Sequence, residues 1–128
     1  MRIIEIIGSR RRNTSKDKTA TYQAFLRIYE DGDEIVSGGC PQGGDAFAEW
    51  IAKVEEVPIK IHYARWKKHG KAAGFLRNKD IATDANILIA CVALDRKGGT
   101  EDTITKFLKD CGGLTEAEAI VMGRLILV

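Results

Sequence analysis

Short apolar segments alternate along this chain with segments whose apolar residues recur at helical spacing. The strand-like segments cover residues 3–7, 34–37, 59–63 and 86–92. The segments with helical spacing cover about residues 14–29, 47–54, 73–84 and 100–111, of which 73–84 is the least regular. Thr100 is the expected N-cap of the last of these helices. Strands that alternate with helices of about 10–15 residues predict an α/β fold, an open parallel sheet with helices on both faces.

Residues 115–128 carry two conflicting signals. Thr115 and Glu118 have the spacing of a capping box, which favours a helix. The segments 120–122 and 125–128 are rich in β-prone residues, which favours a final strand with a turn or bulge at Gly123. We favour the strand and leave the helix open.

Length, hydropathy and cysteine content exclude several protein classes. A chain of 128 residues suits one domain, which we expect to span residues 1–128. No apolar run reaches the roughly 18 residues of a membrane span, and the first residues do not resemble a signal peptide. The three cysteines, Cys40, Cys91 and Cys111, have no CxxC spacing. We expect reduced thiols in a cytoplasmic protein, with no membrane partner, no metal site and no cofactor.

The net charge of +2 hides an uneven distribution of basic residues. Residues 8–18 hold five of them against one acid, and residues 64–79 hold six and no acid. These two basic stretches therefore contain eleven of the twenty basic residues. If they meet in space they would attract an anionic partner; otherwise they are two separate solvated loops.

The expected topology brings these stretches to one edge of the sheet. Right-handed crossovers place every strand-to-helix loop at the carboxyl edge, where open α/β sheets bind ligands. The loops concerned are residues 8–13, 37–44, 64–72 and 95–100. We therefore expect the basic stretches and the glycine-rich loops to be neighbours.

Three of the predicted strands lead into glycine-rich loops. These are Gly8-Ser9-Arg10, the stretch 37–45, and Gly98-Gly99-Thr100. A phosphate group needs close backbone approach and converging N–H groups at a helix N-terminus, and glycines in strand-to-helix loops meet both needs. The second loop matches neither GxGxxG nor the Walker A pattern, which disfavours dinucleotide oxidoreductases and P-loop NTPases.

Four motifs in order resemble the SLOG superfamily. They read IIGSR, SGG-x-x-x-GGD, GFLRN-x-x-IA-x-x-A and GGTED, and the similarity spans about residues 3–110. This superfamily of Rossmann-like proteins includes the LOG phosphoribohydrolases, the DNA-processing protein DprA, molybdenum-cofactor carriers and the YspA- and YpsA-related proteins. The chain is most similar to the small stand-alone YspA-type members. The resemblance implies a Rossmann-like fold and a nucleotide or nucleotide-derived ligand.

The resemblance also implies a set of site residues. The first and second loops would form two pocket walls, with Asp45 holding the loop or a ligand hydroxyl. Arg77 and Asn78 match the arginine position of LOG-like proteins, and the third loop would cradle phosphate. The implied ligand-binding residues are Gly8, Ser9, Arg10, Ser37, Gly38, Gly39, Gly43, Gly44, Asp45, Arg77, Asn78, Gly98, Gly99 and Thr100.

One departure from the LOG signature bears on catalysis. Where LOG enzymes carry the glutamate that supports cleavage of the N-glycosidic bond, this chain has Thr103. Glu101 and Asp102 lie nearby, and they would either assist catalysis or stabilise the helix dipole. Turnover of the ligand is thus left open, with Arg77, Glu101 and Asp102 as the catalytic candidates.

Three functions follow from these features. The first is a sensor, carrier or modifier that binds a phosphorylated nucleotide-type ligand, with the base near Trp66 or Phe75. The second is a phosphoribohydrolase that acts on a nucleoside monophosphate. The third is DprA-like binding of single-stranded DNA through the basic runs 10–12 and 65–68, where bases stack and phosphates pair. We also expect a homo-oligomer, because the predicted helices leave an apolar surface through which copies of the chain could pair.

Overall fold

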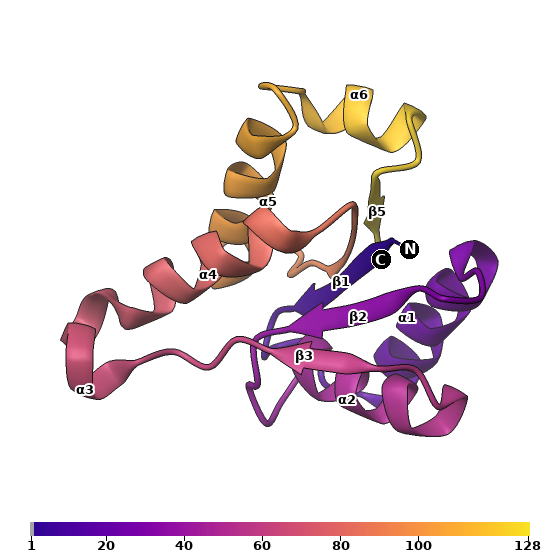
Figure 1. The fold of residues 1–128 in the computed structure, drawn as a ribbon, viewed down its shortest axis with the longest axis horizontal. Helices are drawn as coiled ribbons and strands as arrows, with labels where there is room; N and C mark the ends of the chain where they lie inside the picture. Colours follow the sequence, from indigo (N-terminus) through magenta and orange to yellow (C-terminus); the bar gives the residue numbers. More distant parts are fainter. Residues whose placement is uncertain (1) are drawn as a thin grey trace.

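The computed structural model describes residues 2–128, without the side chains of residues 66, 71, 75, 81, 83 and 84. Its centre is a five-stranded parallel sheet with the strand order β3-β2-β1-β4-β5 (Figure 1). The strands are β1 (Ile3–Gly8), β2 (Glu34–Ser37), β3 (Ile59–Ile61), β4 (Ile87–Cys91) and β5 (Leu125–Leu127). The order places β1, the first strand in sequence, at the centre. The predicted open parallel sheet is confirmed.

Helices pack on both faces of this sheet, as expected. The first face is covered by α1 (Ser15–Ile28) and α2 (Gly44–Glu55), and the second by α4 (Ala73–Asp84), α5 (Gly99–Asp110) and α6 (Glu116–Val121) (Figure 1). Ile4 and Ile6 of β1 pack with Phe25 on the first face. Ile7 packs with Phe107 on the second. Neighbouring strand residues face opposite sides, so β1 contributes to both cores.

The C-terminal segment contains both of the elements that its sequence suggested. Thr115 and Glu118 form a complete capping box at the start of α6, with each side chain accepting a backbone N–H of the other residue at 3.1 Å. After α6 the chain passes Gly123 at φ 73 and enters β5, which pairs with β4. The favoured strand is therefore present, and the capping box marks a separate short helix before it.

The start of α5 differs from the prediction. The N-cap is Gly98, with a φ of 117, and Thr100 lies inside the first turn. The prediction of Thr100 as N-cap was wrong because glycine adopts this backbone conformation readily and starts the helix without a capping side chain. The N-cap residue of this helix therefore makes no side-chain hydrogen bond to its first N–H groups.

Residues 64–72, expected as a loop, are largely helical. They contain α3 (Trp66–His69) and a 3₁₀ turn, η1 (Gly70–Ala72), which leads directly into α4. Gly70 follows α3 with a φ of 56, a left-handed conformation typical of helix C-termini. Figure 1 shows α3 at the far end of α4, away from the sheet. Among residues 2–128, no helix is long and apolar enough to cross a membrane.

Candidate functional site

A cavity of about 380 Å³ lies at the carboxyl ends of β1 and β4. Its walls come from the β1–α1 loop, the β2–α2 loop, α4 and the start of α5. Nine of the fourteen predicted ligand-binding residues line it: Gly8, Ser9, Arg10, Asp45, Arg77, Asn78, Gly98, Gly99 and Thr100. The topology thus brings three of the four predicted loops, together with α4, to one site.

The N-terminus of α5 forms one wall of the cavity. No side chain caps this helix at Gly98, and the Asp102 N–H donates to the Gly98 carbonyl at 3.4 Å. The first N–H groups of an α-helix have no partner within the helix, and they carry the positive end of its dipole. The 12-residue helix therefore presents donors and positive potential to the cavity at Gly98, Gly99 and Thr100.

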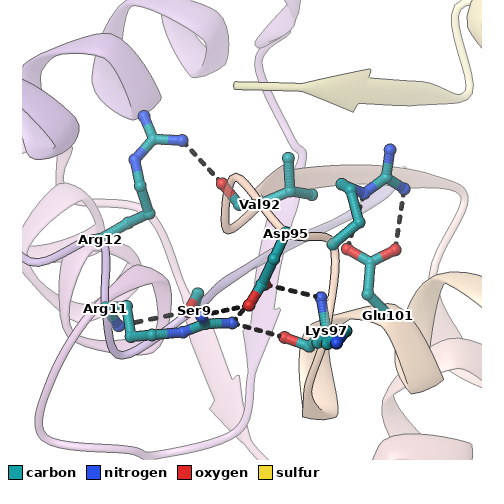
Figure 2. A network of polar contacts seen from close by, with 8 residues as sticks. Ser9, Arg11, Arg12, Val92, Asp95, Lys97 and Glu101 are labelled. Atoms are coloured by element: carbon teal, nitrogen blue, oxygen red, sulfur yellow. Dashed lines mark hydrogen bonds and ion pairs between the residues drawn. The ribbon is translucent and has the colours of Figure 1, made fainter.

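The two carboxylates in the first turn of α5 are neutralised outside this wall. Glu101, labelled in Figure 2, accepts from Arg96 Nε at 2.8 Å. The Arg96 guanidinium also contacts Glu116 of α6 at 3.0 Å. The hydrogen bond to Glu101 raises the pKa of Arg96 further above its ordinary value. Asp102 contacts Lys106 Nζ at 2.6 Å and accepts from Asn78 Nδ2 at 3.1 Å. Neither carboxylate lines the cavity.

Another part of the wall contains Arg77 and Asp45, which both approach Gly38 at the end of β2. Arg77 Nη1 donates to the Gly38 carbonyl at 2.6 Å, and Arg77 Nε donates to Asn78 Oδ1 at 3.1 Å. A Cβ at Gly38 would lie 2.8 Å from Arg77 Nη1 and 2.9 Å from Asp45 Oδ2. The absence of a side chain therefore lets the guanidinium and the carboxylate come close over the end of the strand.

Asp45 is a buried carboxylate in this wall, with 7% of its surface exposed. It accepts hydrogen bonds from Ser37 Oγ at 3.0 Å and from the Cys40 N–H at 3.1 Å. Burial raises the pKa of Asp45, while these hydrogen bonds and the charge of Arg77 act in the opposite direction. The side chain thus fixes the β2–α2 loop and also reaches the cavity.

The other five predicted residues do not line the cavity. They are Ser37, Gly38, Gly39, Gly43 and Gly44. Gly44 shows why this loop is rich in glycine, because a Cβ there would lie 2.1 Å from the Gly8 nitrogen. The N-terminus of α2 therefore packs directly against the end of β1, which positions Asp45 beside it.

The first basic stretch contributes three arginines with different partners. Arg10 is exposed and lines the cavity. Arg11 also lines it, and its two terminal nitrogens each lie 2.7 Å from the Asp95 carboxylate (Figure 2). Arg12 donates to Asp17 Oδ1 and to the Val92 carbonyl, both at 2.8 Å, and so holds the loop from the outside.

Of the described basic side chains in the second basic stretch, only that of Arg77 lines the cavity. Among the described side chains of residues 64–72, none lines the cavity. The expectation that both stretches meet at one site is thus met in part, because α3 and η1 carry most of the second stretch away (Figure 1). The side chains of Trp66 and Phe75, expected near a base, lie outside the described part of the structure.

The predicted ligand-binding set did not include five of the lining residues: Ile7, Arg11, Cys40, Lys97 and Thr103. Lys97 directly precedes Gly98, and Cys40 lies inside the second glycine-rich loop, so adjacency to the motifs could have indicated both. Thr103 lies one helical turn after Gly99, and its Oγ1 donates to the Gly99 carbonyl at 3.2 Å. The position of Arg11 depends on a partner 84 residues away, for which the sequence gives no local signal.

The cysteines are free thiols in separate places. Cys91 is fully buried in β4, and burial raises its pKa, whereas Cys40 and Cys111 are half-buried. Within the described residues, no group of three or more histidine, cysteine, aspartate or glutamate side chains could hold a metal ion.

Two solved structures share the fold of this chain. The molybdenum cofactor binding protein of the phototrophic bacterium Rippkaea orientalis has a TM-score of 0.68 and 21% sequence identity, over 99% of this chain and 88% of that protein. DNA processing protein A of Helicobacter pylori, which binds single-stranded DNA, has a TM-score of 0.67 and 17% sequence identity. The similarity covers 98% of this chain and 74% of that protein. Both similarities confirm the expected Rossmann-like α/β fold.

Sequence comparison gives a nearer relative. No family model matches the chain. The Gene 61 protein of Mycobacterium phage D29 is 31% identical over 107 residues, which cover 78% of this chain and 83% of the relative. The chain belongs to the family of this phage protein.

Proposed function

We propose that the cavity binds a nucleotide or nucleotide-derived ligand by its phosphate. The observation that carries the proposal is the uncapped N-terminus of α5, which opens into the cavity beside Arg10 and Lys97. Helix N-termini bind phosphate through backbone N–H groups and the helix dipole, and arginine adds charge-assisted hydrogen bonds. The protein would act as a sensor, carrier or modifier of such a ligand.

The size and charge of the cavity support a small anion. Its 380 Å³ fall within the range of about 300–1,000 Å³ for small-molecule sites. Among the described lining residues are four cations, Arg10, Arg11, Arg77 and Lys97, and one carboxylate, Asp45. The cations favour a phosphate, and the carboxylate offers an acceptor for a ligand hydroxyl.

Cleavage of the ligand is the alternative, and the side-chain directions favour binding without turnover. A phosphoribohydrolase would need Glu101 or Asp102 at the reacting bond, with Arg77 as its partner. Glu101 pairs with Arg96, and Asp102 pairs with Lys106. Each carboxylate would have to leave its cation to reach the cavity. Release of free base from a nucleoside monophosphate by the purified protein would establish the enzyme.

A second candidate function is binding of single-stranded DNA by the segment that follows β3. Tyr63 is 65% exposed, and Arg65, Lys67 and Lys68 are exposed on a part of the chain that projects from the sheet (Figure 1). Cations beside an aromatic ring suit a single strand. The similar DNA processing protein A binds single-stranded DNA. Such binding would weaken steeply with salt and would survive substitution in the cavity.

The organisation of the chain is a further part of the proposal. We propose that residues 1–128 form one SLOG-like domain of the YspA type, which works as a homo-oligomer. The sheet draws strands from both ends of the chain, which supports one unit. Ile120, Val121 and Met122 are 45%, 87% and 58% exposed on and just after α6, which offers an apolar surface for pairing.

Mass spectrometry of the native protein tests the proposed ligand. The protein purified under mild conditions should carry a phosphate-containing small molecule whose mass identifies it. Arg77→Ala should lose this molecule, whereas Glu101→Gln should keep it. Wild-type protein that carries nothing, and that binds none of a set of added nucleotides, would contradict the proposal.

A further inference from the structure

Arg11 of the β1–α1 loop holds the part of the β4–α5 loop that directly precedes α5. Arg11 Nη1 and Nη2 contact the two oxygens of Asp95, each at 2.7 Å, and Nη2 also donates to the Lys97 carbonyl at 3.0 Å (Figure 2). The Lys97 N–H donates to Asp95 Oδ1 at 3.1 Å. The Arg11 guanidinium therefore joins Asp95 and Lys97 in one hydrogen-bonded network immediately before Gly98.

Arg96, which follows Asp95, connects the same loop to α5 and α6. Arg96 has a φ of 54 and pairs with Glu101 and Glu116, the first acids of α5 and α6. The Arg96 N–H donates to the Ala93 carbonyl at 3.0 Å, which forms a turn. The side chains of residues 95 and 96 thus anchor the loop to different elements, Asp95 to the β1–α1 loop and Arg96 to the two helices.

We propose that Arg11 and Asp95 are positioning residues for the anion site, an inference that rests on the proposed function. Both terminal nitrogens of Arg11 are engaged by the loop, and this loop carries Lys97 and Gly98 to the cavity. A site built from backbone N–H groups needs them within about 0.5 Å of the productive geometry. The Arg11–Asp95 pair would keep the N–H groups in place by holding the start of α5 against the end of β1.

Positioning and direct contact predict opposite effects for Asp95→Asn. If Arg11 contacts the anion directly, Asp95 competes for it, and removing that negative charge strengthens anion binding. If the pair positions the loop, Asp95→Asn weakens anion binding although the site becomes more positive. The ion pair is partly exposed, so we expect a weakening of about threefold to tenfold.

The experiment measures binding of adenosine 5′-monophosphate and of inorganic phosphate to five proteins by calorimetry. These are the wild type, Asp95→Asn, Arg11→Gln, the double variant, and Glu49→Gln, which removes a charge from the exposed face of α2. Asp95→Asn and the double variant should both bind more weakly than wild type, and the double variant should be no weaker than Arg11→Gln, because both residues serve one contact. Glu49→Gln should bind as wild type does.

Hydrogen exchange of the free proteins makes the test independent of the ligand. The backbone amides of residues 97–101 should exchange faster in Asp95→Asn than in wild type. Unchanged exchange there, or tighter binding of either probe by Asp95→Asn, would overturn the positioning role. If wild type binds neither probe, the proposed function fails, and the exchange rates still decide whether the pair fixes the loop.

Discussion

Arg77 Nη1 of α4 donates a 2.6 Å hydrogen bond to the carbonyl oxygen of Gly38 at the end of β2. Asp45, at the start of α2 on the other face of the sheet, approaches the same glycine. Helices from opposite faces therefore meet at the carboxyl edge of one strand. This contact fixes the guanidinium in the cavity wall, and several testable consequences depend on it.

Gly38→Ala should weaken ligand binding more than it weakens the fold. The new Cβ would lie 2.8 Å from Arg77 Nη1, so the guanidinium must move. The backbone of Gly38 lies outside the left-handed region, so alanine causes no backbone strain there. We expect about a tenfold loss of affinity for adenosine 5′-monophosphate, with a loss of about 1–2 kcal/mol in the free energy of unfolding. Calorimetry and urea denaturation measure the two effects, and unchanged affinity would contradict the assigned role of Arg77.

Gly44→Ala should act on the fold itself. Its Cβ would lie 2.1 Å from the Gly8 nitrogen, a backbone atom that cannot move without disturbing β1. We expect a loss of at least about 3 kcal/mol in the free energy of unfolding by urea. Gly99→Ala is the matched control, because the nearest described atom to its Cβ would be Asn78 Nδ2, at 3.8 Å. It should stay within about 0.5 kcal/mol of wild type, and equal losses in the two variants would show that the packing of α2 on β1 is described wrongly.

Substitutions at Arg77 and Glu101 should separate binding from catalysis. Arg77→Ala removes a charged donor from the cavity wall and should reduce the affinity for a nucleoside monophosphate by about tenfold to a hundredfold. Glu101→Gln should change the affinity by less than about threefold, because Glu101 pairs with Arg96 outside the cavity. Fluorescence or calorimetric titration measures both. Release of base by wild type that stops in Glu101→Gln, while binding persists, would instead support the phosphoribohydrolase.

Asp45 should make the stability of the free protein depend on pH. Its pKa in the folded protein is raised above the ordinary value of 3.8, so the folded state retains this proton more firmly than the unfolded state. The contribution of Asp45 to stability is therefore greatest at acidic pH and falls as the pH rises above that ordinary value. Asp45→Asn should remove this fall, so that the wild type loses stability relative to the variant as pH rises. Urea denaturation at several pH values measures the difference, and a difference of the opposite sign would contradict the burial of this carboxylate.

The sheet and most helices could be predicted because they depend on local patterns. The short apolar run of β1 and the helical stripe of α5 follow from which side chains face the core, as Ile4, Ile104 and Phe107 do. Chain direction and crossover handedness then place the glycine-rich loops at one edge. These steps need no knowledge of any particular long-range contact.

The directions of the charged side chains could not be predicted in the same way. Glu101 lies next to the phosphate motif in sequence, yet Arg96 draws it away through a left-handed backbone conformation that is uncommon for arginine. Arg11 and Asp95 pair across 84 residues, and the helix over residues 66–69 carries the second basic stretch away from the cavity. Such contacts depend on the folded geometry, so sequence spacing identified the loops of the site but not which of their charges face the ligand.

The most direct test of the central claim is a titration of isotopically labelled protein, followed by NMR. Adenosine 5′-monophosphate should shift the backbone amide signals of Gly98, Gly99 and Thr100 in a saturable manner, and adenosine, which lacks the phosphate, should leave them nearly unchanged. This result would place the phosphate at the N-terminus of α5. Equal shifts with both compounds, or shifts confined to the segment 62–69, would contradict the account.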